Sequence, residues 1–268
     1  MLSSVAMIPH AVLEALPVSA RIPSATEVLA ECGAYRVRLA LDDDDRRCLY
    51  RLRFLVFNLE LHEGLDASYL DGMDRDQFDS VCDHLMVEHR ESGRIVGTYR
   101  LQTGDVAGRH FGYYSAQEFD FTRYEPLRPE VVECGRACIH REFRSFEVLT
   151  LLWRGIALYA VSRGARYLIG CSSVTSQDTA HGSAMYCRLQ NYLVSPELQT
   201  VPTEAYGFAL EPEQLDAPQP PKLLRAYLTV GAKICGPPAL DREFKTIDFL
   251  TLLDLEKMAP SARARYVR

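Results

Sequence analysis

The chain has 268 residues, of which 47% are apolar and 25% are charged, and its formal net charge is -6 at pH 7. This composition is that of a globular protein with a sizeable core, and the negative charge gives no electrostatic reason to expect nucleic-acid binding. No apolar stretch approaches the roughly 20 residues that cross a bilayer. The N-terminus lacks the basic start of a secretory signal, and the eight cysteines include no C-x-x-C pair. We therefore expect a cytoplasmic protein with reduced thiols and no metal site.

The first half of the chain shows strand and helix patterns around an aspartate-rich stretch. Alternation of polar and apolar residues predicts the first strand, and the acidic run from Asp42 to Asp45 supplies an N-cap and favourable charge at the start of a helix. In chain order we expect an irregular arm at 1–34, a strand at 35–40, a helix from 42 to about 59, a polar loop at 62–80, and strands at 84–88 and 95–103 joined by a turn at 91–93.

The second half alternates strands with amphipathic helices. Ser115 and Glu118 stand at capping-box spacing, which predicts the start of a short helix. The remaining expected elements are a strand at 131–139, a helix at 146–163, a buried strand at 166–173, a helix at 180–192, a proline-rich insertion at 196–221, a helix at 222–234 and a strand at 247–253 before a basic tail. This order indicates an α/β fold with a mixed sheet and helices on both of its faces.

Charged side chains occur where a simple core would not place them. Arg53 flanks the apolar stripe of the first expected helix, and a buried arginine requires an anion. Asp76 and Asp79 in the following loop supply carboxylates that pair bidentately with guanidinium groups, and Arg100 is the natural second arginine. Two interpretations remain open: a structural ion-pair cluster that orders the loop, or direct participation in a functional site.

Glu133 and Arg136 lie three residues apart in a predicted strand. On a regular strand such residues point to opposite faces, but Gly135 allows a bulge that brings both side chains to one side and splays the strand. A splayed strand presents unpaired backbone N–H groups, which can hold a thioester carbonyl or its oxyanion. The alternative is an ordinary strand with one exposed ion pair.

Four short motifs carry a resemblance to a known family. They are L-R-x-x-V-F at 52–57, D-x-[FY]-D at 76–79, G-T-Y-R-L at 97–101 and E-x-x-R at 133–136. In this order they resemble the GCN5-related (GNAT) acyltransferases, which include acyl-homoserine lactone synthases, N-acyl amino acid synthases and the haemolysin-like ornithine-lipid N-acyltransferases. The resemblance implies a mixed, mostly antiparallel sheet flanked by helices, with a splayed central strand. It covers residues 35–255, with an insertion at 196–221, and leaves out the arm and a basic tail at 256–268.

Further stretches are similar to the ornithine-lipid branch, at 111–120, 135–140, 152–156, 170–173, 231–233 and 241–244. Lactone synthases carry a tryptophan where Glu63 stands in this sequence, which argues against lactone formation. The phosphate-cradling loop of acetyl-CoA enzymes is replaced by residues 141–146. The resemblance therefore implies a donor other than acetyl-CoA.

The resemblance implies an enzyme that moves a long-chain fatty acyl group, with or without a 3-hydroxyl, from an acyl carrier protein thioester to the α-amine of an amino acid. Ornithine is the expected acceptor. Another amino acid and a homoserine lactone product are the alternatives, and a non-catalytic, haemolysin-like lipid-binding protein is a distant one. The expected partners are acyl carrier protein, the amino acid and, peripherally, the inner membrane, with no tightly bound cofactor.

An amine must lose a proton before it attacks, so we expect a base, acting directly or through water, and Glu133 is the candidate. Main-chain N–H groups near Cys134 would hold the oxyanion. Tyr186 resembles a helical tyrosine that protonates the leaving thiolate in some members of the fold; its alternative is a core position. With Glu133 and Arg136 as catalytic residues, the substrate-binding candidates are Arg53, Phe57, Asp76, Asp79, Arg100 and Cys134.

The segment from 136 to 166 holds six arginines and only two glutamates, in a chain that is acidic overall. Acyl carrier protein is strongly acidic, so this local positive charge suits its docking. The candidates for contact with the carrier and its pantetheine are Arg141, Arg144 and Arg154. A solvated helix face is the alternative.

Overall fold

A nine-stranded sheet runs through this computed structural model, which describes residues 28–211 and 219–267. The strands are β1 (Val28–Cys32), β2 (Tyr35–Leu39), β3 (Asp83–His89), β4 (Arg94–Thr103), β5 (Val131–Ile139), β6 (Tyr167–Val174), β7 (Lys233–Ile234), β8 (Ala239–Asp241) and β9 (Thr246–Asp254). Their order is β1-β2-β3-β4-β5-β6-β9-β7, and β8 also pairs with β9. All pairs are antiparallel except β5 with β6. The expected mixed, mostly antiparallel sheet is confirmed.

The helices begin where the sequence supplies caps. They are α2 (Asp43–Phe54), its π-helical continuation (Leu55–Glu60), α3 (Gly104–Arg109), α4 (Phe146–Ser162), α5 (Thr179–Leu189), α6 (Lys222–Val230) and α7 (Pro260–Tyr266). Short 3-10 helices span Asp66–Leu70, Gln77–Ser80, Ser115–Gln117, Thr122–Glu130, Arg141–Phe143, Gln190–Tyr192 and Pro196–Leu198. The Asp42 side chain caps α2, and the Ser145 side chain caps α4. Within the described ranges, no helix has both the length and the apolarity that crossing a membrane requires.

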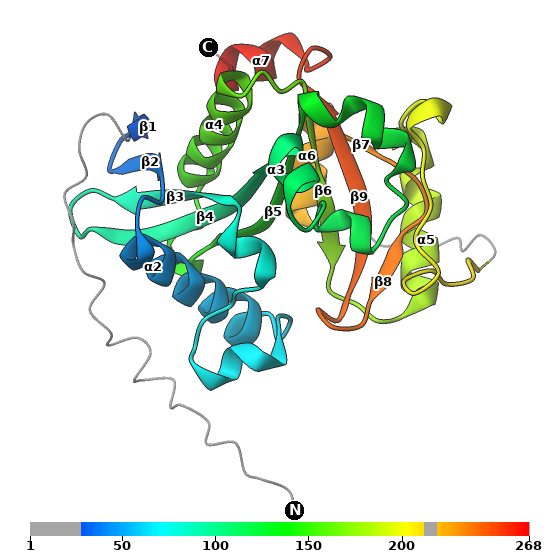
Figure 1. The fold of residues 1–268 in the computed structure, drawn as a ribbon, viewed down its shortest axis with the longest axis horizontal. Helices are drawn as coiled ribbons and strands as arrows, with labels where there is room; N and C mark the ends of the chain where they lie inside the picture. The colour runs from blue at the N-terminus through cyan, green and yellow to red at the C-terminus, as the bar shows by residue number, and fades with distance from the viewer. Residues whose placement is uncertain (1–27, 212–218, 268) are drawn as a thin grey trace, which may run out of the picture.

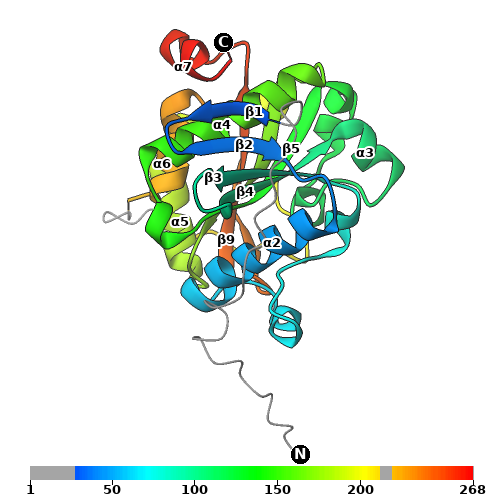
Figure 2. The same ribbon diagram turned by 90° about the vertical axis from the view of Figure 1, so that its left-hand side faces the viewer.

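Helices α4 and α2 cover opposite faces of the first half of the sheet. Figure 1 shows α4 above β3 and β4 and α2 below them, and Figure 2 turns β1 to β4 toward the viewer. Leu152 of α4 belongs to one buried cluster with Val37 and Leu85 of the strands. Leu52 of α2 packs with Cys138 of β5 on the other face. Because both faces are covered, β3 and β4 are buried along most of their length.

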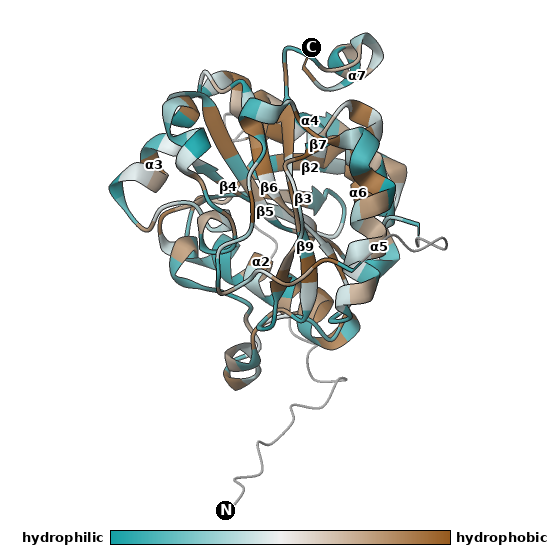
Figure 3. Ribbon diagram, turned by 90° about the vertical axis from the view of Figure 1, so that its right-hand side faces the viewer, coloured by the Kyte–Doolittle hydropathy of each residue, from teal (hydrophilic) through white to brown (hydrophobic). Residues whose placement is uncertain are grey.

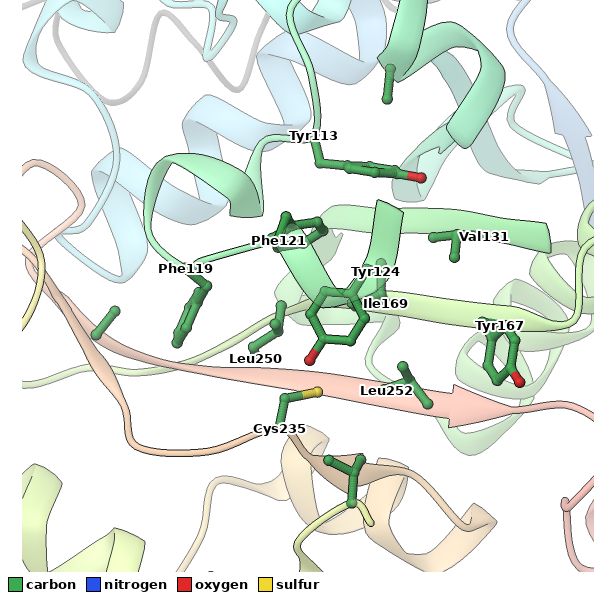
Figure 4. Packing of buried hydrophobic residues seen from close by; sticks show 13 residues of the cluster. Tyr113, Phe119, Phe121, Tyr124, Val131, Tyr167, Ile169, Cys235, Leu250 and Leu252 are labelled. Atoms are coloured by element: carbon green, nitrogen blue, oxygen red, sulfur yellow. The ribbon is translucent and has the colours of Figure 1, made fainter. Parts of the chain in front are cut away.

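The second half of the sheet carries a separate aromatic core. Figure 4 shows Tyr113, Phe119 and Phe121, from the segment that precedes β5, packed with Ile169 of β6 and Leu250 of β9. In Figure 3 hydrophobic residues gather along β9 and its neighbours, whereas α3 is mostly hydrophilic. This packing fixes the segment before β5 against β6 and β9.

Strands β5 and β6 pair only where they begin. Their parallel pairing joins 131–133 to 167–169 and then stops. On its other edge β5 carries one extra residue relative to β4, and Arg136 has a φ of 51°, which is the left-handed region. The expected bulge and splay are confirmed, with the left-handed conformation at Arg136 and not at Gly135.

The two ends of the described chain contain more regular structure than expected. Val28–Cys32, assigned to the irregular arm, is strand β1 and pairs with β2; the rest of that arm, 1–27, lies outside the described residues. The expected basic tail contains helix α7, which begins with Pro260 at its first position. Part of the arm and part of the tail thus join the domain.

Two helix predictions need correction. Helix α6 ends at Val230 and not at 234, because Gly231 adopts a φ of 107° and the chain then enters β7. The helix at Ser115 is one 3-10 turn without a side-chain cap, so the expected capping box with Glu118 does not form. Glu133 of β5 instead accepts hydrogen bonds from the N–H groups at the start of this turn.

The proline-rich insertion is anchored to the aromatic segment. The Asp120 N–H donates to the Val201 carbonyl at 3.0 Å, and the Thr203 N–H donates to the Glu118 carbonyl at 2.8 Å. Residues 212–218 of the insertion lie outside the described residues. The described part therefore fixes the segment around Glu118 from its outer side.

Candidate active site

A cavity of about 320 Å³ occupies the gap between the diverging strands β5 and β6. Its wall includes residues 134–137 of β5 and 170–173 of β6. Charged groups at one end are Glu63, Arg100, Glu133, Arg136, Asp241 and Asp248. Apolar and aromatic side chains at the other end are Trp153, Ile156, Leu224, Tyr227, Val230, Leu255, Met258 and Tyr266. One cavity thus joins charged groups on the splayed strand to an apolar region lined by α4, α6 and α7.

Arg53 is a fully buried cation behind this cavity. Its Nε donates to Asp74 at 2.8 Å, and its two Nη atoms donate to the oxygens of Asp79 at 2.7 and 3.0 Å. Burial alone would raise the pKa of Asp79, but the charge of Arg53 outweighs it and holds that pKa well below its ordinary value. Arg53 does not line the cavity. Its geometry matches the structural ion-pair interpretation.

Arg100 and Arg136 share Asp76 and also line the cavity. Nη1 of Arg100 lies 2.7 Å from both oxygens of Asp76, and Nη2 of Arg136 donates to Asp76 at 2.8 Å. Burial opposes ionisation of Asp76, but the two arginines outweigh it and lower its pKa. Arg136 also stacks on the Phe244 ring, with its Cζ 4.0 Å from the ring centre. The loop aspartates therefore fix both guanidinium groups at the cavity wall.

Glu133 supplies the cap that the 3-10 turn lacks. It is 5% exposed, and its two oxygens accept from the Tyr114 N–H at 2.8 Å and the Ser115 N–H at 2.7 Å. Burial raises the pKa of Glu133, and these hydrogen bonds partly oppose the rise. Glu133 also lines the cavity. It is thus both a fixed support for the preceding segment and a carboxylate beside the splayed strand.

Cys134 lines the cavity next to Glu133. Burial, and then the neighbouring carboxylate, raises the pKa of its thiol far above the ordinary value. A thiol that stays protonated is a poor nucleophile. The site therefore favours direct transfer over an acyl-enzyme intermediate on Cys134.

Helix α7 closes the apolar end of the cavity. Tyr266 is 4% exposed and packs against Trp153 of α4, with ring centres 5.5 Å apart. The hydroxyl groups of Tyr99 and Tyr227 pair with each other nearby, so their polar atoms are satisfied within an otherwise apolar wall. This end is suited to a chain of methylene groups and not to a charged ligand.

The predicted substrate-binding and catalytic residues divide by position. Those that line the cavity are Phe57, Arg100, Glu133, Cys134 and Arg136. Those that stand behind it in the ion-pair cluster are Arg53, Asp76 and Asp79. The charged motifs therefore form a structural ion-pair cluster and also reach the cavity, because the aspartates hold Arg100 and Arg136 at its wall.

Tyr186 does not reach the cavity. It is half-buried on α5 and packs against the apolar cluster that contains Leu224 of α6 and Phe249 of β9. Its position matches the core alternative, because α5 places this side chain against that cluster.

The three arginines expected at the carrier protein lie outside the cavity. Arg141 and Arg144 are exposed in the short connection between β5 and α4, and Arg154 is half-buried further along α4. Arg144 donates to both oxygens of Glu60 at 2.5 and 2.8 Å. Two of the three thus present positive charge at the β5–α4 junction.

The sequence analysis missed a cluster of three buried carboxylates. One oxygen each from Glu118, Asp241 and Asp248 lies within 4.8 Å of the others. Burial raises the pKa of Glu118 well above its ordinary value and that of Asp248 to about 6. Glu118 and Asp241 lie in stretches that resemble the ornithine-lipid branch, but no local spacing connects them. Their proximity follows from the pairing of β8 with β9 and from the anchoring of the preceding aromatic segment.

Glu63 is a second cavity residue that the sequence left without a role. It is 8% exposed, and its carboxylate accepts from the Thr175 hydroxyl. Burial raises its pKa. The position that carries tryptophan in lactone synthases thus adds a further acid to the charged end.

Known proteins share both the sequence and the fold of this chain. Residues 52–154 match the family model described as acetyltransferase (GNAT) domain. The chain is 30% identical over 261 residues to an "L-ornithine N(alpha)-acyltransferase" of Brucella abortus (strain 2308), covering 90% of each chain. It is 32% identical over 243 residues to the Agrobacterium fabrum (strain C58) protein of the same name, covering 85% of this chain and 83% of that one. The chain belongs to this GNAT N-acyltransferase family.

Solved structures of the same fold support the architecture. The acyl-homoserine lactone synthase LasI has a TM-score of 0.52 at 13% identity, covering 87% of this chain and 94% of its own. TofI, solved in complex with an inhibitor and MTA, has a TM-score of 0.51 at 18% identity, covering 84% and 95%. At such identities the likeness shows the fold and not the product. As a GNAT acyltransferase, the chain is an enzyme that transfers acyl groups.

Proposed function

We propose that this GNAT acyltransferase moves a long-chain fatty acyl group from the thioester of acyl carrier protein to the α-amine of ornithine. The observation that carries the proposal is the cavity in the splay, which joins two fixed arginines to an apolar region. An acyl amino acid has the same division into a charged head and an apolar chain. The names of the relatives, which span most of the chain, give the acceptor.

The arginines on the cavity wall are suited to the acceptor's carboxylate. Arg136 and Arg100 are held by Asp76, so little side-chain entropy is lost when a ligand arrives. Guanidinium groups bind carboxylates through paired hydrogen bonds. An amino acid whose carboxylate lies at Arg136 would place its α-amine beside the splayed strand β5.

The reaction is a direct displacement at the thioester carbonyl. The amine nitrogen forms a bond to the carbonyl carbon, the carbon–sulfur bond breaks, and the pantetheine thiolate leaves with the electron pair and takes up a proton. Glu133 accepts the proton of the attacking amine, directly or through one water. Main-chain N–H groups on the β6-facing edge of residues 134–136, beyond the last pairing with β6, stabilise the oxyanion.

The donor would approach from the β5–α4 junction. Arg141 and Arg144 are exposed there, and Arg154 extends the positive charge along α4, so an acidic carrier protein would be attracted. The fatty chain would occupy the region that α4, α6 and α7 line. A carrier-protein donor would place the reaction in the cytoplasm, with the acylated product at the surface of the inner membrane.

Thiol release from long-chain acyl carrier protein tests this proposal. The purified full chain is incubated with the donor and a panel of amino acids, and the product is identified by mass spectrometry. We expect turnover with ornithine and an N-acylornithine product. Arg136→Lys should lower kcat/KM about 10- to 100-fold, since lysine keeps the charge but loses the fork and the stacking on Phe244.

Two results would count against the proposal. No thiol release with any amino acid would remove the enzymatic function as stated here. Formation of a homoserine lactone would replace the product while keeping the fold. A matched control is Arg109→Lys, because Arg109 is exposed on α3 and does not line the cavity; this variant should retain full activity.

A further inference from the structure

The carboxyl cluster formed by Glu118, Asp241 and Asp248 has no counter-ion among the described residues. The three residues are 1%, 3% and 3% exposed. Within residues 28–211 and 219–267, no lysine, arginine or histidine forms an ion pair with any of them. Buried carboxylates are costly unless a cation or hydrogen-bond donors compensate them. A cation or hydrogen-bond donor that compensates these carboxyl groups must therefore come from outside the described part of the protein.

Two oxygens of the cluster lack a hydrogen-bond partner in the described part of the chain, and one of them belongs to Asp248, which lines the cavity. Oε1 of Glu118 and Oδ1 of Asp248 are buried and have no hydrogen-bond partner among the described residues. The other oxygens are partly satisfied: Asp248 Oδ2 accepts from Thr246 at 3.2 Å, and Glu118 Oε2 lies 3.6 Å from the Cys171 sulfur. Asp241 Oδ1 accepts from the N–H groups of residues 243 and 244 at 2.8 and 2.9 Å. Unsatisfied buried acceptors of this kind indicate a bound donor.

The cluster shares the cavity with the arginine that faces the acceptor. Asp241 and Asp248 line the same cavity as Arg136, and Arg136 stacks on Phe244, which lies in the loop that follows Asp241. Arg136 and the carboxyl groups of Asp241 and Asp248 thus lie at the charged end of the same cavity. This pairing matches the opposite charges on the two ends of a basic amino acid.

The protein holds the third acid in place before any ligand binds. Glu118 follows the turn that Glu133 caps, and it precedes Phe119, which packs with Leu250 of β9 (Figure 4). Its carbonyl also accepts from the Thr203 N–H at 2.8 Å. Preorganised acceptors bind a cation without the cost of first ordering themselves.

We propose that the carboxylate cluster binds the side-chain ammonium group of a basic amino-acid acceptor while Arg136 binds its α-carboxylate. This inference rests on the proposed function and identifies the part of the site that selects the acceptor. A basic amino acid has two amines, and only one is acylated. Contact with the carboxylates keeps the side-chain amine protonated and non-nucleophilic, so the α-amine is left to attack the thioester at β5.

Norvaline provides the decisive comparison, because it has the carbon skeleton of ornithine without the side-chain nitrogen. With the purified full chain and long-chain acyl carrier protein, we expect kcat/KM for ornithine to exceed that for norvaline about 100-fold, since the acids are left unpaired by norvaline. Asp248→Asn and Glu118→Gln should each lower kcat/KM for ornithine about tenfold or more. Their kcat/KM for norvaline should not fall below that of wild type, because norvaline makes no contact with these acids.

Asp105→Asn is the matched control, because Asp105 is exposed on α3 and pairs only locally with Arg109. This variant should keep the full preference for ornithine. Thermal unfolding of each variant separates a lost binding group from a lost fold. If a cluster variant fails to fold, the ornithine-to-norvaline ratio of the wild type, together with the thermal shift that each amino acid induces, still decides the question.

Each of the remaining outcomes either overturns the inference or removes the proposed function. Equal use of ornithine and norvaline by the wild type would overturn this inference and leave the proposed function standing, whereas no acylation of either would remove the proposed function. Equal losses on both substrates in the cluster variants would assign the acids a structural role and overturn the inference. Loss of wild-type activity in EDTA, restored by Mg²⁺, Mn²⁺ or Ca²⁺, would assign the cluster to a metal ion and likewise overturn it.

Discussion

Glu133 has a fixed position and a raised pKa, which are two properties of an effective base. Main-chain N–H groups hold both oxygens, and burial raises the pKa of the carboxyl. We predict that Glu133→Gln lowers kcat/KM about 100-fold. The base acts only when deprotonated, so the wild-type rate should fall as the pH drops through the Glu133 pKa. Thiol release between about pH 5 and 9 should show this acid limb in the wild type, whereas the variant should keep only the rise at higher pH that comes from titration of the substrate amine.

Glu130→Gln is the control for this variant. Glu130 is exposed immediately before β5, so its replacement should change neither the rate nor the pH profile. The glutamine at 133 also loses one of the two main-chain hydrogen bonds, which lowers stability by about 1 kcal/mol. An acid limb in Glu133→Gln at the same pH as in the wild type would show that the residue supports the fold and does not accept the proton.

Asp248 gives a prediction that needs no substrate. Burial and the charge of Asp241 raise its pKa in the folded protein to about 6 from the ordinary 3.8. A raised folded pKa contributes stability below the unfolded pKa, and that contribution is lost as the pH rises through about 6. At pH 7 without ligand, Asp248→Asn should therefore be more stable than wild type by about 1 to 3 kcal/mol.

Urea unfolding at several pH values measures this difference. The advantage of Asp248→Asn should shrink as the pH falls toward about 4, because the wild-type carboxyl then takes up a proton in the folded state. Asp105→Asn, at an exposed position, should show no such trend. A variant that is less stable than wild type at pH 7 would mean that the carboxylate already has a stabilising partner in the free protein.

The partner of a residue could be predicted from the sequence where the residue type in a motif requires a particular partner. A buried arginine needs an anion, so the pairing of Arg53 with Asp79 followed from the residue types and the family order. The carboxylate cluster could not be predicted in this way, because Glu118, Asp241 and Asp248 come from separate segments that meet only in the folded sheet. The surroundings of Tyr186 could not be predicted for a related reason: a local resemblance does not say which neighbour a helix face will contact.

Secondary-structure elements could likewise be predicted where their cause is local in the sequence, but not where it lies in distant segments. Gly135 was enough to predict a bulge in β5, but not that Arg136 would adopt the left-handed conformation, since its ion pairs and ring stacking come from other elements. Strands β7 and β8 have only two and three residues, too few for alternation to be read. Helix α7 was hidden by its arginines, although it buries Tyr266.

Helix α7 sets the length of the apolar end of the cavity. Tyr266 lies there against Trp153, so Tyr266→Ala should open space for additional methylene groups. We predict that the ratio of kcat/KM for a longer acyl chain over a shorter one rises about tenfold. Competition between two acyl carrier proteins, with the products resolved by mass spectrometry, measures this ratio.

The control for this prediction lies on the same helix. Arg263 is exposed on α7, and Arg263→Ala should leave the chain-length preference unchanged. Tyr266→Ala also removes a buried ring, which costs about 3 to 5 kcal/mol of stability, so the ratio is measured below the unfolding temperature of the variant. An unchanged ratio would place the end of the acyl chain elsewhere.

In the molecule as a whole, the site lies where the sheet divides. The first half, β1 to β5, lies between α2 and α4, and the second half, β6 to β9, carries the aromatic core. Each half is held by its own packing, so the two can diverge without exposing an apolar face. The charged motifs come from the first half and two of the three cluster acids come from β8 and β9. The proposed acceptor site therefore forms only when both halves are folded.

The approach of the donor can be tested on the molecular surface. Exposed Arg141 and Arg144 lie at the β5–α4 junction, outside the cavity. We predict that Arg141→Ala with Arg144→Ala raises KM for acyl carrier protein about tenfold with little change in kcat, because rim charges act mainly on association. Added salt should weaken the wild type in the same direction and the double variant less.

A free pantetheine thioester of the same fatty acid separates docking from chemistry, because it carries no protein surface. The double variant should use this small donor as well as the wild type does. Glu60→Gln is the matched control, since it breaks the ion pair of Arg144 with Glu60 while leaving the positive charge in place. This control should not raise KM for the carrier protein. If the double variant loses both donors equally, these arginines act on the pantetheine or the fold, and the carrier protein docks on another surface.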